Sequence, residues 1–508
     1  MTSDNEHKEP VVPEGARDDV VIARARRRSR RRLIALVLGP ALALAVLLLP
    51  APDGFGTASW RLVGLAGWMV VWWLGEAVPL PATALLPIPF MPLMGIAKMA
   101  PTAANYGHPL IFLFLGGFVL AAAMQRWGLH RRIALRIVRL AGASPGGIIA
   151  GFMAASAFLS MWISNTAAAI MMYAVGLSVI GFVSERTPDR AVTRNFAVAL
   201  MLGIAYSASI GGAGTLIGTP PNALLASFLQ EAYGIRVSFF TWMLIGLPVV
   251  AVMLPLAWLL LTRVIYPARR LAIGDMHSVI HDELAALGPM SRGERTVAAV
   301  FVAAALGWIL NKPVAGMTGL PINDTTVALI AACLLFALPV SLKRGQFAVD
   351  WETVRQVPWG ILLLFGGGLA LAAAFKSTGL SGTIGTAVGG VPGVSVWVIV
   401  LLSAALVIYL TEITSNTAST ATLLPVMGAV AVGLGQDPRL LTVPVALGAS
   451  MAFMMPVATP PNAIVFAYED MELADMVRAG FWLNVIAVIV CFGAVYLLAG
   501  AVFGVTVK

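Results

Sequence analysis

Apolar segments recur almost from one end of the chain to the other, separated by short polar or glycine- and proline-rich connections. The longest runs, such as residues 33–50, 237–262 and 480–503, are close to the length of about 20 residues that a helix needs to cross a bilayer. Other runs are shorter and contain Gly, Pro or Asn, a pattern typical of broken or re-entrant helices. The pattern predicts an all-α polytopic membrane protein with about eleven transmembrane helices and two re-entrant hairpins.

Composition supports this prediction and limits the alternatives. Of 508 residues, 59% are hydrophobic and only 11% are charged, which a water-soluble fold of this size could not accommodate. The net charge of +9 would suggest nucleic acid in a soluble protein, but here the arginines gather in loops and in the N-terminal tail. The positive-inside rule explains that distribution better. Cys333 and Cys491 lie in apolar runs without metal-ligand spacing, so both are expected to be small core residues.

The N-terminal residues carry topological information. Residues 1–23 are polar and expected to be disordered, and a run rich in arginine, residues 24–32, precedes the first apolar segment. This order places the N-terminus in the cytoplasm, and the absence of a convincing small-residue cleavage site favours a retained first span over a secretory signal. We expect a multi-pass protein of the cytoplasmic (inner) membrane, with a basic tail at 1–32, a first half at 33–262, a cytoplasmic linker at 263–295 and a second half at 296–508.

An internal repeat is the strongest organisational signal. Three signatures occur twice and in the same order, and two of them share one offset of 251 residues. The pairs are IFLFLGGFVLAAAMQRWGL (111–129) with LLLFGGGLALAAAFKSTGL (362–380), Ser-Asn-Thr at 164–166 with 415–417, and Thr-Pro-Pro-Asn at 219–222 with 459–462. The last pair is 240 residues apart. The two halves therefore have a common architecture.

The two copies differ in charge. Residues 126–139 of the first copy contain five arginines, whereas the corresponding part of the second copy has only Lys376. The positive-inside rule then places the first connection in the cytoplasm and the second outside. Such inverted repeats are typical of secondary transporters, whose substrate site lies near the bilayer midplane where the repeats meet.

The repeated Ser-Asn-Thr motifs are predicted to be helix breaks, which a bilayer tolerates only inside protein or along a wet cavity. A helix that restarts there offers its N-terminus to an anion. Hydroxyl and amide groups next to it supply neutral oxygens that suit Na+. The groups in question are Ser160, Ser164, Asn165 and Thr166 in the first copy, and Thr411, Thr414, Ser415, Asn416 and Thr417 in the second.

The Thr-Pro-Pro-Asn motifs complete this prediction. Proline ends a helix and removes a donor, so the carbonyls of Gly218 and Ala458 are candidate cation ligands, with Gly214 as a further backbone candidate. Thr219 and Thr459 are expected to face the anion. A single Ser-Asn-Thr is more often a packing contact between helices, but two copies, each followed by Thr-Pro-Pro-Asn, favour a binding site.

Two acids stand in apolar surroundings, and an intramembrane acid is by default a functional candidate. For Glu76 and Glu412 we favour a structural role, in which each carboxylate bonds a neighbouring break in the backbone.

The motifs, together with WWLGEAVPLPATALLPI at 72–88, resemble the divalent anion/sodium symporter (DASS) family over nearly all of the chain after residue 33. The resemblance implies a homodimer with a scaffold domain and a transport domain that moves as an elevator. It implies a first sodium site at Ser160, Ser164, Asn165 and a carbonyl near Gly214 or Gly218, and a second at Thr411, Asn416, Ala458 and the carbonyl of Thr414. It implies substrate contacts from Asn165, Thr166, Thr219, Asn416, Thr417 and Thr459.

The leading functional hypothesis is Na+-coupled symport of C4-dicarboxylates such as succinate, malate or fumarate. Sodium-independent exchange, and citrate or sulfate as substrate, remain open, because neutral polar groups do not rank these anions. An intramembrane enzyme is disfavoured because the chain has five histidines but no HExxH or paired-acid spacing. A primary pump is disfavoured because no GxxxxGK[ST] motif occurs.

Overall fold

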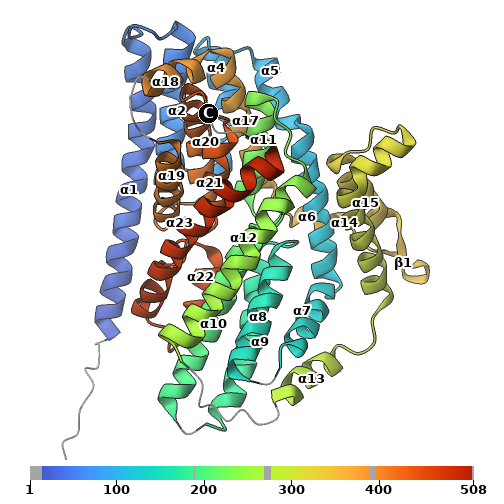
Figure 1. Ribbon diagram of the computed structural model, residues 1–508. Coiled ribbons are helices and arrows are strands. Elements are labelled where there is room, and N and C mark those ends of the chain that lie inside the picture. The colour runs from blue at the N-terminus through green and yellow to red at the C-terminus, as the bar shows by residue number, and fades with distance from the viewer. Residues whose placement is uncertain (1–13, 143, 188, 268–275, 390–394, 506–508) are drawn as a thin grey trace, which may run out of the picture.

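The computed structural model describes residues 14–142, 144–187, 189–267, 276–389 and 395–505. Over these residues the protein is a bundle of helices with one short two-stranded hairpin (Figure 1). Within the same residues, eight helices are long and apolar enough to cross a membrane, and five shorter apolar helices accompany them. The prediction of an all-α polytopic membrane protein is confirmed.

The first half contains long helices and several short helical segments. They are α1 (Glu14–Leu48), α2 (Thr57–Gly75), α3 (Leu80–Thr83), α4 (Pro87–Leu93), α5 (Met99–Ala104), the 3-10 turn η1 (Asn105–Gly107), α6 (Pro109–Arg126), α7 (Leu129–Leu140), α8 (Pro145–Ser160), α9 (Asn165–Ser184), α10 (Arg190–Gly212), α11 (Pro220–Tyr233), α12 (Phe239–Leu259) and the π-helical turn η2 (Leu260–Ile265).

The second half follows the same order after a connecting helix. Its elements are α13 (Met276–Ala286), α14 (Arg292–Thr318), α15 (Asp324–Ala337), β1 (Pro339–Ser341), η3 (Leu342–Arg344), β2 (Gln346–Phe347), α16 (Trp351–Arg355), α17 (Trp359–Ser377), α18 (Leu380–Gly389), α19 (Val396–Thr411), α20 (Asn416–Gly433), α21 (Arg439–Ala449), α22 (Pro460–Val465) and α23 (Leu473–Phe503). Residues 268–275 of the expected linker lie outside the described residues.

Two expectations about individual segments are wrong. Residues 14–23 of the expected disordered tail are helical, because no proline interrupts them and the helix continues through the arginine-rich residues 24–32 into the apolar run of α1; residues 1–13 lie outside the described residues. Cys333 is exposed on α15 rather than buried, whereas Cys491 is buried in α23 as expected. An exposed apolar face is ordinary in a helix that contacts lipid, so a cysteine in an apolar run need not point inward.

The sequence repeat is also a structural repeat. Helices α7 and α18 begin at Leu129 and Leu380, and α9 and α20 begin at Asn165 and Asn416, so both pairs are 251 residues apart (380 − 129 and 416 − 165). In Figure 1, α7 lies at the lower end of the molecule beside α13, and α18 lies at the upper end. The two copies therefore run in opposite directions, as an inverted repeat requires.

Close glycine contacts lock the two halves together. A Cβ atom on Gly116 of α6 would lie 2.6 Å from the carbonyl oxygen of Ala328 in α15. A Cβ atom on Gly367 of α17, at the equivalent position (367 − 116 = 251), would lie 2.5 Å from the carbonyl oxygen of Ala84. Only glycine permits either approach, so each half contributes one helix that packs backbone to backbone on the other half.

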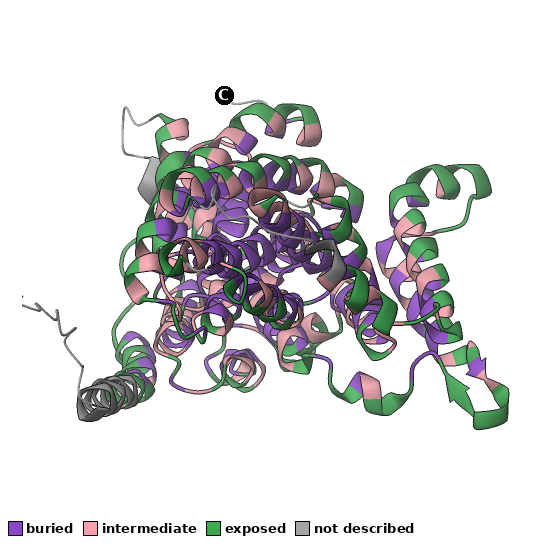
Figure 2. Cartoon of the chain, turned by 90° about the horizontal axis from the view of Figure 1, so that it is seen from below, coloured by how far each residue is buried: buried purple, intermediate pink, exposed green. Residues whose placement is uncertain are grey.

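Buried side chains fill the centre of the bundle, and exposed ones form its periphery (Figure 2). Much of that periphery is apolar. On α1, for example, Leu33, Val37 and Leu48 are 61%, 69% and 75% exposed. An apolar surface of this extent is expected to contact lipid rather than water.

A binding site between two helix breaks

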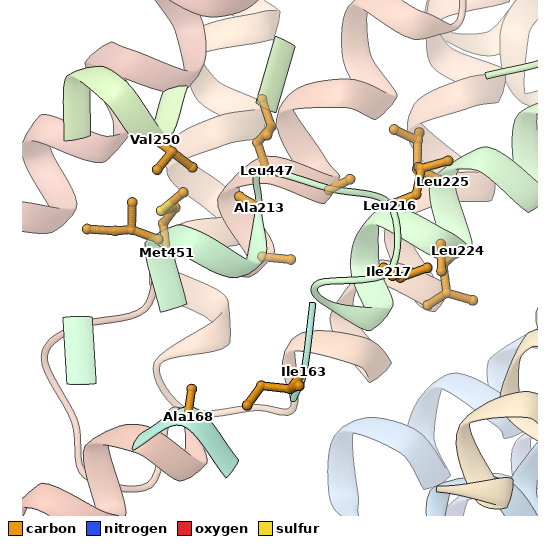
Figure 3. Packing of buried hydrophobic residues seen from close by; sticks show 14 of the residues in the cluster. Ile163, Ala168, Ala213, Leu216, Ile217, Leu224, Leu225, Val250, Leu447 and Met451 are labelled. Carbon is orange, nitrogen blue, oxygen red and sulfur yellow. The ribbon is translucent and has the colours of Figure 1, made fainter. Parts of the chain in front are cut away.

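Two hairpins and two unwound segments converge near the middle of the bundle. Residues 161–164 separate α8 from α9, and residues 412–415 separate α19 from α20. We call these segments the first and second tips. The unwound segments, residues 213–219 and 450–459, precede α11 and α22. Apolar packing holds these breaks in place: Ile163 of the first tip belongs to the same buried cluster as Ala213, Leu216 and Ile217 (Figure 3).

A cavity of about 1370 Å³ lies between these four breaks. Most of the residues predicted to form the site line this cavity, although they come from both halves of the chain. They are Ser164, Asn165, Thr166, Gly218 and Thr219 from the first half, and Thr414, Ser415, Asn416, Thr417, Ala458 and Thr459 from the second. The spacing of motifs in the sequence thus led to groups that the fold brings together.

Three predicted residues do not line the cavity. Ser160 and Thr411 are fully buried behind the first and second tips. Gly214 is buried in the first unwound segment, and its carbonyl oxygen would lie 3.0 Å from a Cβ atom on Gly246 of α12. Of these three, Ser160 is joined to the cavity by a hydrogen bond, whereas Gly214 lies against α12.

At the first tip, side chains cap the helix that restarts. The hydroxyl oxygen of Ser164 accepts a hydrogen bond from the backbone amide of Ala167 at 3.2 Å, which makes Ser164 the N-cap of α9. The Ser160 hydroxyl donates to Oδ1 of Asn165 at 2.5 Å. These bonds fix the N-terminus of α9 and group neutral oxygens beside it.

The second tip has the same cap and one important difference. Ser415 accepts from the amide of Ala418 at 3.5 Å and is the N-cap of α20. The hydroxyl of Thr414 donates to the carbonyl of Leu410 at 2.7 Å, so it is bonded to the last turn of α19. Oδ1 of Asn416 is buried and has no hydrogen-bond partner among the described residues.

This unpartnered oxygen tests whether the residues fit a cation. A buried acceptor without a donor costs free energy, unless something positive that the protein itself does not supply satisfies it. Na+ would fill this role at Asn416, with the Thr414 and Ala458 carbonyls as further neutral oxygens. The donor set consists of hydroxyl, amide and carbonyl oxygens, which suits a hard monovalent cation.

The asparagines that end the Thr-Pro-Pro-Asn motifs have a role that the sequence analysis did not assign. The side-chain amide of Asn222 donates to the carbonyls of Gly212 and Thr215 at 3.0 and 2.7 Å. The side-chain amide of Asn462 donates in the same way to the carbonyls of Ala452 and Met455, at 3.2 and 3.0 Å. Each asparagine therefore bridges the carbonyls of an unwound segment. The sequence did hold a sign of this role, because the two asparagines recur 240 residues apart.

Side chains also join each tip to its unwound segment. The hydroxyl of Thr215 donates to the carbonyl of Met161 at 2.5 Å. In the second half Glu412 does the joining, and its carboxylate accepts from the amides of Phe453, Met454 and Met455 at 2.7, 2.9 and 2.9 Å. Asn484 of α23 donates to the same carboxylate at 2.7 Å.

These contacts bear out the structural interpretation of Glu412, because its carboxylate bonds a break in the backbone. Glu76 also stands at a break: it ends α2 with a φ of 49°, and it lines the cavity.

Cationic side chains stand where the cavity reaches the α7 end of the bundle. Arg126, the last residue of α6, lines the cavity and pairs with Asp350 at 2.6 Å. Hydrogen bonds from Thr353, followed by those from Arg126, lower the pKa of the Asp350 carboxyl below its usual value. Arg31 also lines this part and donates to the carbonyl of Leu74 at 2.7 Å. Positive charge at this end favours the approach of anions.

The matching protein-family model is described as the sodium:sulfate symporter transmembrane region, and it covers residues 30–505. The chain belongs to this family. The resemblance to divalent anion/sodium symporters is thereby confirmed, and the family to which the chain belongs is one of transporters.

Curated relatives of the family match nearly the whole chain. One, named sodium-dependent dicarboxylate transporter SdcS, from Staphylococcus saprophyticus, is 40% identical over 483 residues, covering 94% of this chain and 93% of the relative. A protein of the same name from Staphylococcus aureus strain USA300 is 39% identical over 486 residues, covering 94% of each chain.

Two solved structures share the fold at low identity. The YdaH transporter of Alcanivorax borkumensis matches with a TM-score of 0.56 and 14% identity, covering 88% of this chain and 99% of that one. MtrF of Neisseria gonorrhoeae matches with a TM-score of 0.57 and 14% identity, covering 92% and 94%. At this identity the likeness supports the fold alone.

Proposed function

We propose that the protein is a secondary active transporter that couples Na+ to the symport of C4-dicarboxylates such as succinate, malate and fumarate. One observation carries the proposal: both tips and both unwound segments line one cavity, with neutral oxygens and two capped helix N-termini. The names of relatives 39% and 40% identical to this chain, sodium-dependent dicarboxylate transporters, point to the same activity.

The two-ended arrangement favours a dicarboxylate as substrate. One carboxylate would be bound by Asn165 and Thr166 at the start of α9, and the other by Asn416 and Thr417 at the start of α20. Thr219 and Thr459 would add hydroxyl donors. Citrate could be bound through two of its carboxylates, whereas the compact sulfate ion lacks two separated charged ends.

Sodium would reduce the cost of placing a dianion in a site without cationic side chains at the tips. The first ion would be held by Ser160, Ser164, Asn165 and backbone carbonyls of the first unwound segment, Gly218 and Gly214 being the candidates. The second would be held by Thr411, Thr414, Asn416 and Ala458. Because the cations and the anion neutralise each other, each would bind more tightly when the other is present.

Alternating access would follow the elevator mechanism that the family resemblance implies. The moving body would consist of α8–α12 and α19–α23, which contain both tips, and the frame would consist of α1–α6 and α14–α17. Helices α7 and α18 would connect them. We further propose a homodimer in the cytoplasmic membrane, with the N-terminus and α7 on the cytoplasmic side, because arginines are concentrated there.

Uptake by the purified protein in liposomes tests this function. Radiolabelled succinate should accumulate under an inward Na+ gradient and not under an equal K+ gradient. Unlabelled malate and fumarate should compete with succinate, and sulfate should compete weakly. Equal succinate uptake with and without sodium would reject symport in favour of exchange.

A further inference from the structure

An aromatic and acidic cluster joins the start of α12 to α14 and α15, and meets the cavity wall at Trp162. Its centre is Phe239, the first residue of α12. The Phe239 ring stacks on Trp308 of α14, with centroids 4.6 Å apart and planes 20° apart. On the other side the ring lies against Trp162 of the first tip, with centroids 6.1 Å apart and planes 28° apart. The ring of Phe239 is thus held between a tip of the site and α14.

The backbone of Phe239 is held as well. Its amide donates to Oδ2 of Asp324 at 3.0 Å, so a carboxyl group on α15 caps the first turn of α12. Asp324 is 3% exposed and is itself fixed by two residues of α14. The amide of Asn311 donates to its Oδ1, and the Trp308 indole donates to its backbone carbonyl at 3.0 Å. The acceptor is therefore held by α14 as well as by α12.

Among the described residues of the second half, no aromatic and acidic cluster stands at the equivalent place. The residue 251 positions after Trp162 is Ile413 (413 − 162 = 251), which is 62% exposed and lines the cavity. The helix that corresponds to α12 is α23, which begins at Leu473, an aliphatic residue. Within the part of the chain that the structure describes, contacts of this kind are therefore seen at the first tip and not at the second.

We propose that Asp324 is a positioning residue that latches the moving body to the frame in the conformation of this structure, through Phe239 and Trp308. This inference rests on the proposed elevator mechanism. If α8–α12 moves against α14 and α15, the Phe239 amide must leave Asp324 and the ring must leave Trp308. The latch therefore favours the conformation in which the cavity reaches the α7 end. It acts through the equilibrium between conformations and does not touch the substrate.

The chain offers a matched pair of substitutions for a test. Asp324→Ala removes the acceptor that the frame provides for the first turn of α12. Ser238→Ala removes a second acceptor of the same turn, which is local: the Ser238 hydroxyl accepts from the amide of Thr241 at 3.1 Å. Both weaken the first turn of α12, but only the first breaks a contact with α15. Asp324→Asn keeps one acceptor oxygen, so this variant should behave more like the parent protein than like Asp324→Ala.

The readout is the side from which a reporter cysteine can be labelled. Val457→Cys, in a background with Cys333→Ala and Cys491→Ala, places a thiol at a cavity position that is 78% exposed. A membrane-impermeant maleimide is applied to intact cells and to inside-out vesicles, without substrate. When Asp324 is intact, labelling should be faster in inside-out vesicles than in intact cells. With Asp324→Ala, the ratio of inside to outside rates should fall roughly tenfold, the effect of losing one strong hydrogen bond.

The outcomes separate the latch from the proposed function. If the ratio of inside to outside labelling rates is the same in Asp324→Ala as in Ser238→Ala, the latch is overturned. If Asp324→Ala is not recovered as folded protein, Phe239→Leu is used in its place. This variant keeps the amide donor but loses the stacking on Trp308. If its ratio of inside to outside labelling rates equals that of the parent protein, the latch is overturned. A parent whose reporter never reacts from outside, even with Na+ and succinate, overturns the elevator mechanism and the latch together. Loss of succinate uptake with normal two-sided labelling overturns only the proposed substrate.

Discussion

Glu412 accepts a hydrogen bond from the backbone amide of Met455 at 2.9 Å, and the equivalent positions of the first half are also hydrogen-bonded, again with the donor in the unwound segment. Those positions are Met161 (412 − 251) and Thr215 (455 − 240), where the Thr215 hydroxyl donates to the Met161 carbonyl at 2.5 Å. In both halves the tip is tied to the unwound segment at the same place. The side chain comes from the tip in one half and from the unwound segment in the other.

Glu412 is therefore expected to be needed for stability. Glu412→Ala leaves the partly buried backbone amides of Met454 and Met455 without their acceptor, at a cost of about 1–3 kcal/mol each, and leaves the Phe453 amide only its longer bond to Oδ1 of Asn484 at 3.3 Å. The variant should give little folded protein, or a thermal midpoint well below that of the parent in detergent. Glu352→Ala, which removes an exposed acid of α16, is the control and should melt like the parent. Equal melting of the two variants would show that the Glu412 contacts contribute nothing to stability.

The buried oxygen of Asn416 predicts an unusual response to sodium. Asn416→Ala removes an acceptor that has no partner among the described residues, so in sodium-free buffer its thermal midpoint should equal or exceed that of the parent. Sodium should raise the midpoint of the parent by mass action, but raise that of Asn416→Ala much less. Asn105→Ala, outside the cavity, should keep the full sodium response. A full response of Asn416→Ala to sodium would remove Asn416 from the cation site.

The two close glycine contacts predict a sharp difference between neighbouring substitutions. Gly116→Ala and Gly367→Ala place a methyl group 2.6 and 2.5 Å from backbone oxygens that cannot give way, so both should greatly reduce the yield of folded protein. Gly368→Ala, one residue further along α17, meets only a Leu224 methyl at 3.5 Å and should be tolerated. Yield of monodisperse protein measures the difference. Normal yield of Gly116→Ala would show that the two halves do not pack this closely.

The opposite orientation of the halves predicts where connecting helices can be labelled. In the cysteine-free background, Arg131→Cys on α7 should react with an impermeant maleimide only in inside-out vesicles, and Ser381→Cys on α18 only in intact cells. The two helices lie at opposite ends of the molecule (Figure 1). Reaction of both from one side of the membrane would contradict the inverted repeat.

The repeat made much of the site predictable from sequence. The recurrence of Ser-Asn-Thr and Thr-Pro-Pro-Asn at fixed offsets identified both breaks of each half, because a break inside a membrane is tolerated only where protein or a cavity surrounds it. It also separated these motifs from ordinary packing contacts. The repeat could not tell that the hydroxyls of Thr411 and Thr414 are used in local bonds to backbone carbonyls, nor that Thr411 lies behind the second tip and not in the cavity wall.

Contacts that break the repeat were not predictable. Thr215 and Glu412 perform equivalent tasks, but neither has a counterpart of the same type at the equivalent position, so comparison of the copies does not reveal them. The contact of Asp324 with Phe239 joins residues 85 positions apart through a backbone amide, which leaves no mark on side-chain patterns. The helical start of α1 was missed for another reason: polarity alone does not distinguish a disordered segment from a solvated helix.

A cryo-EM map of the protein in lipid nanodiscs with Na+ and succinate tests the central claim most directly. The account predicts density for an elongated dianion between Thr166 and Thr417, with ion density beside Asn165 and beside Oδ1 of Asn416. The same map collected in K+ should lack these features. Succinate density away from both helix N-termini, or dianion density that persists unchanged in K+, would contradict a shared site for sodium and dicarboxylate between the two tips.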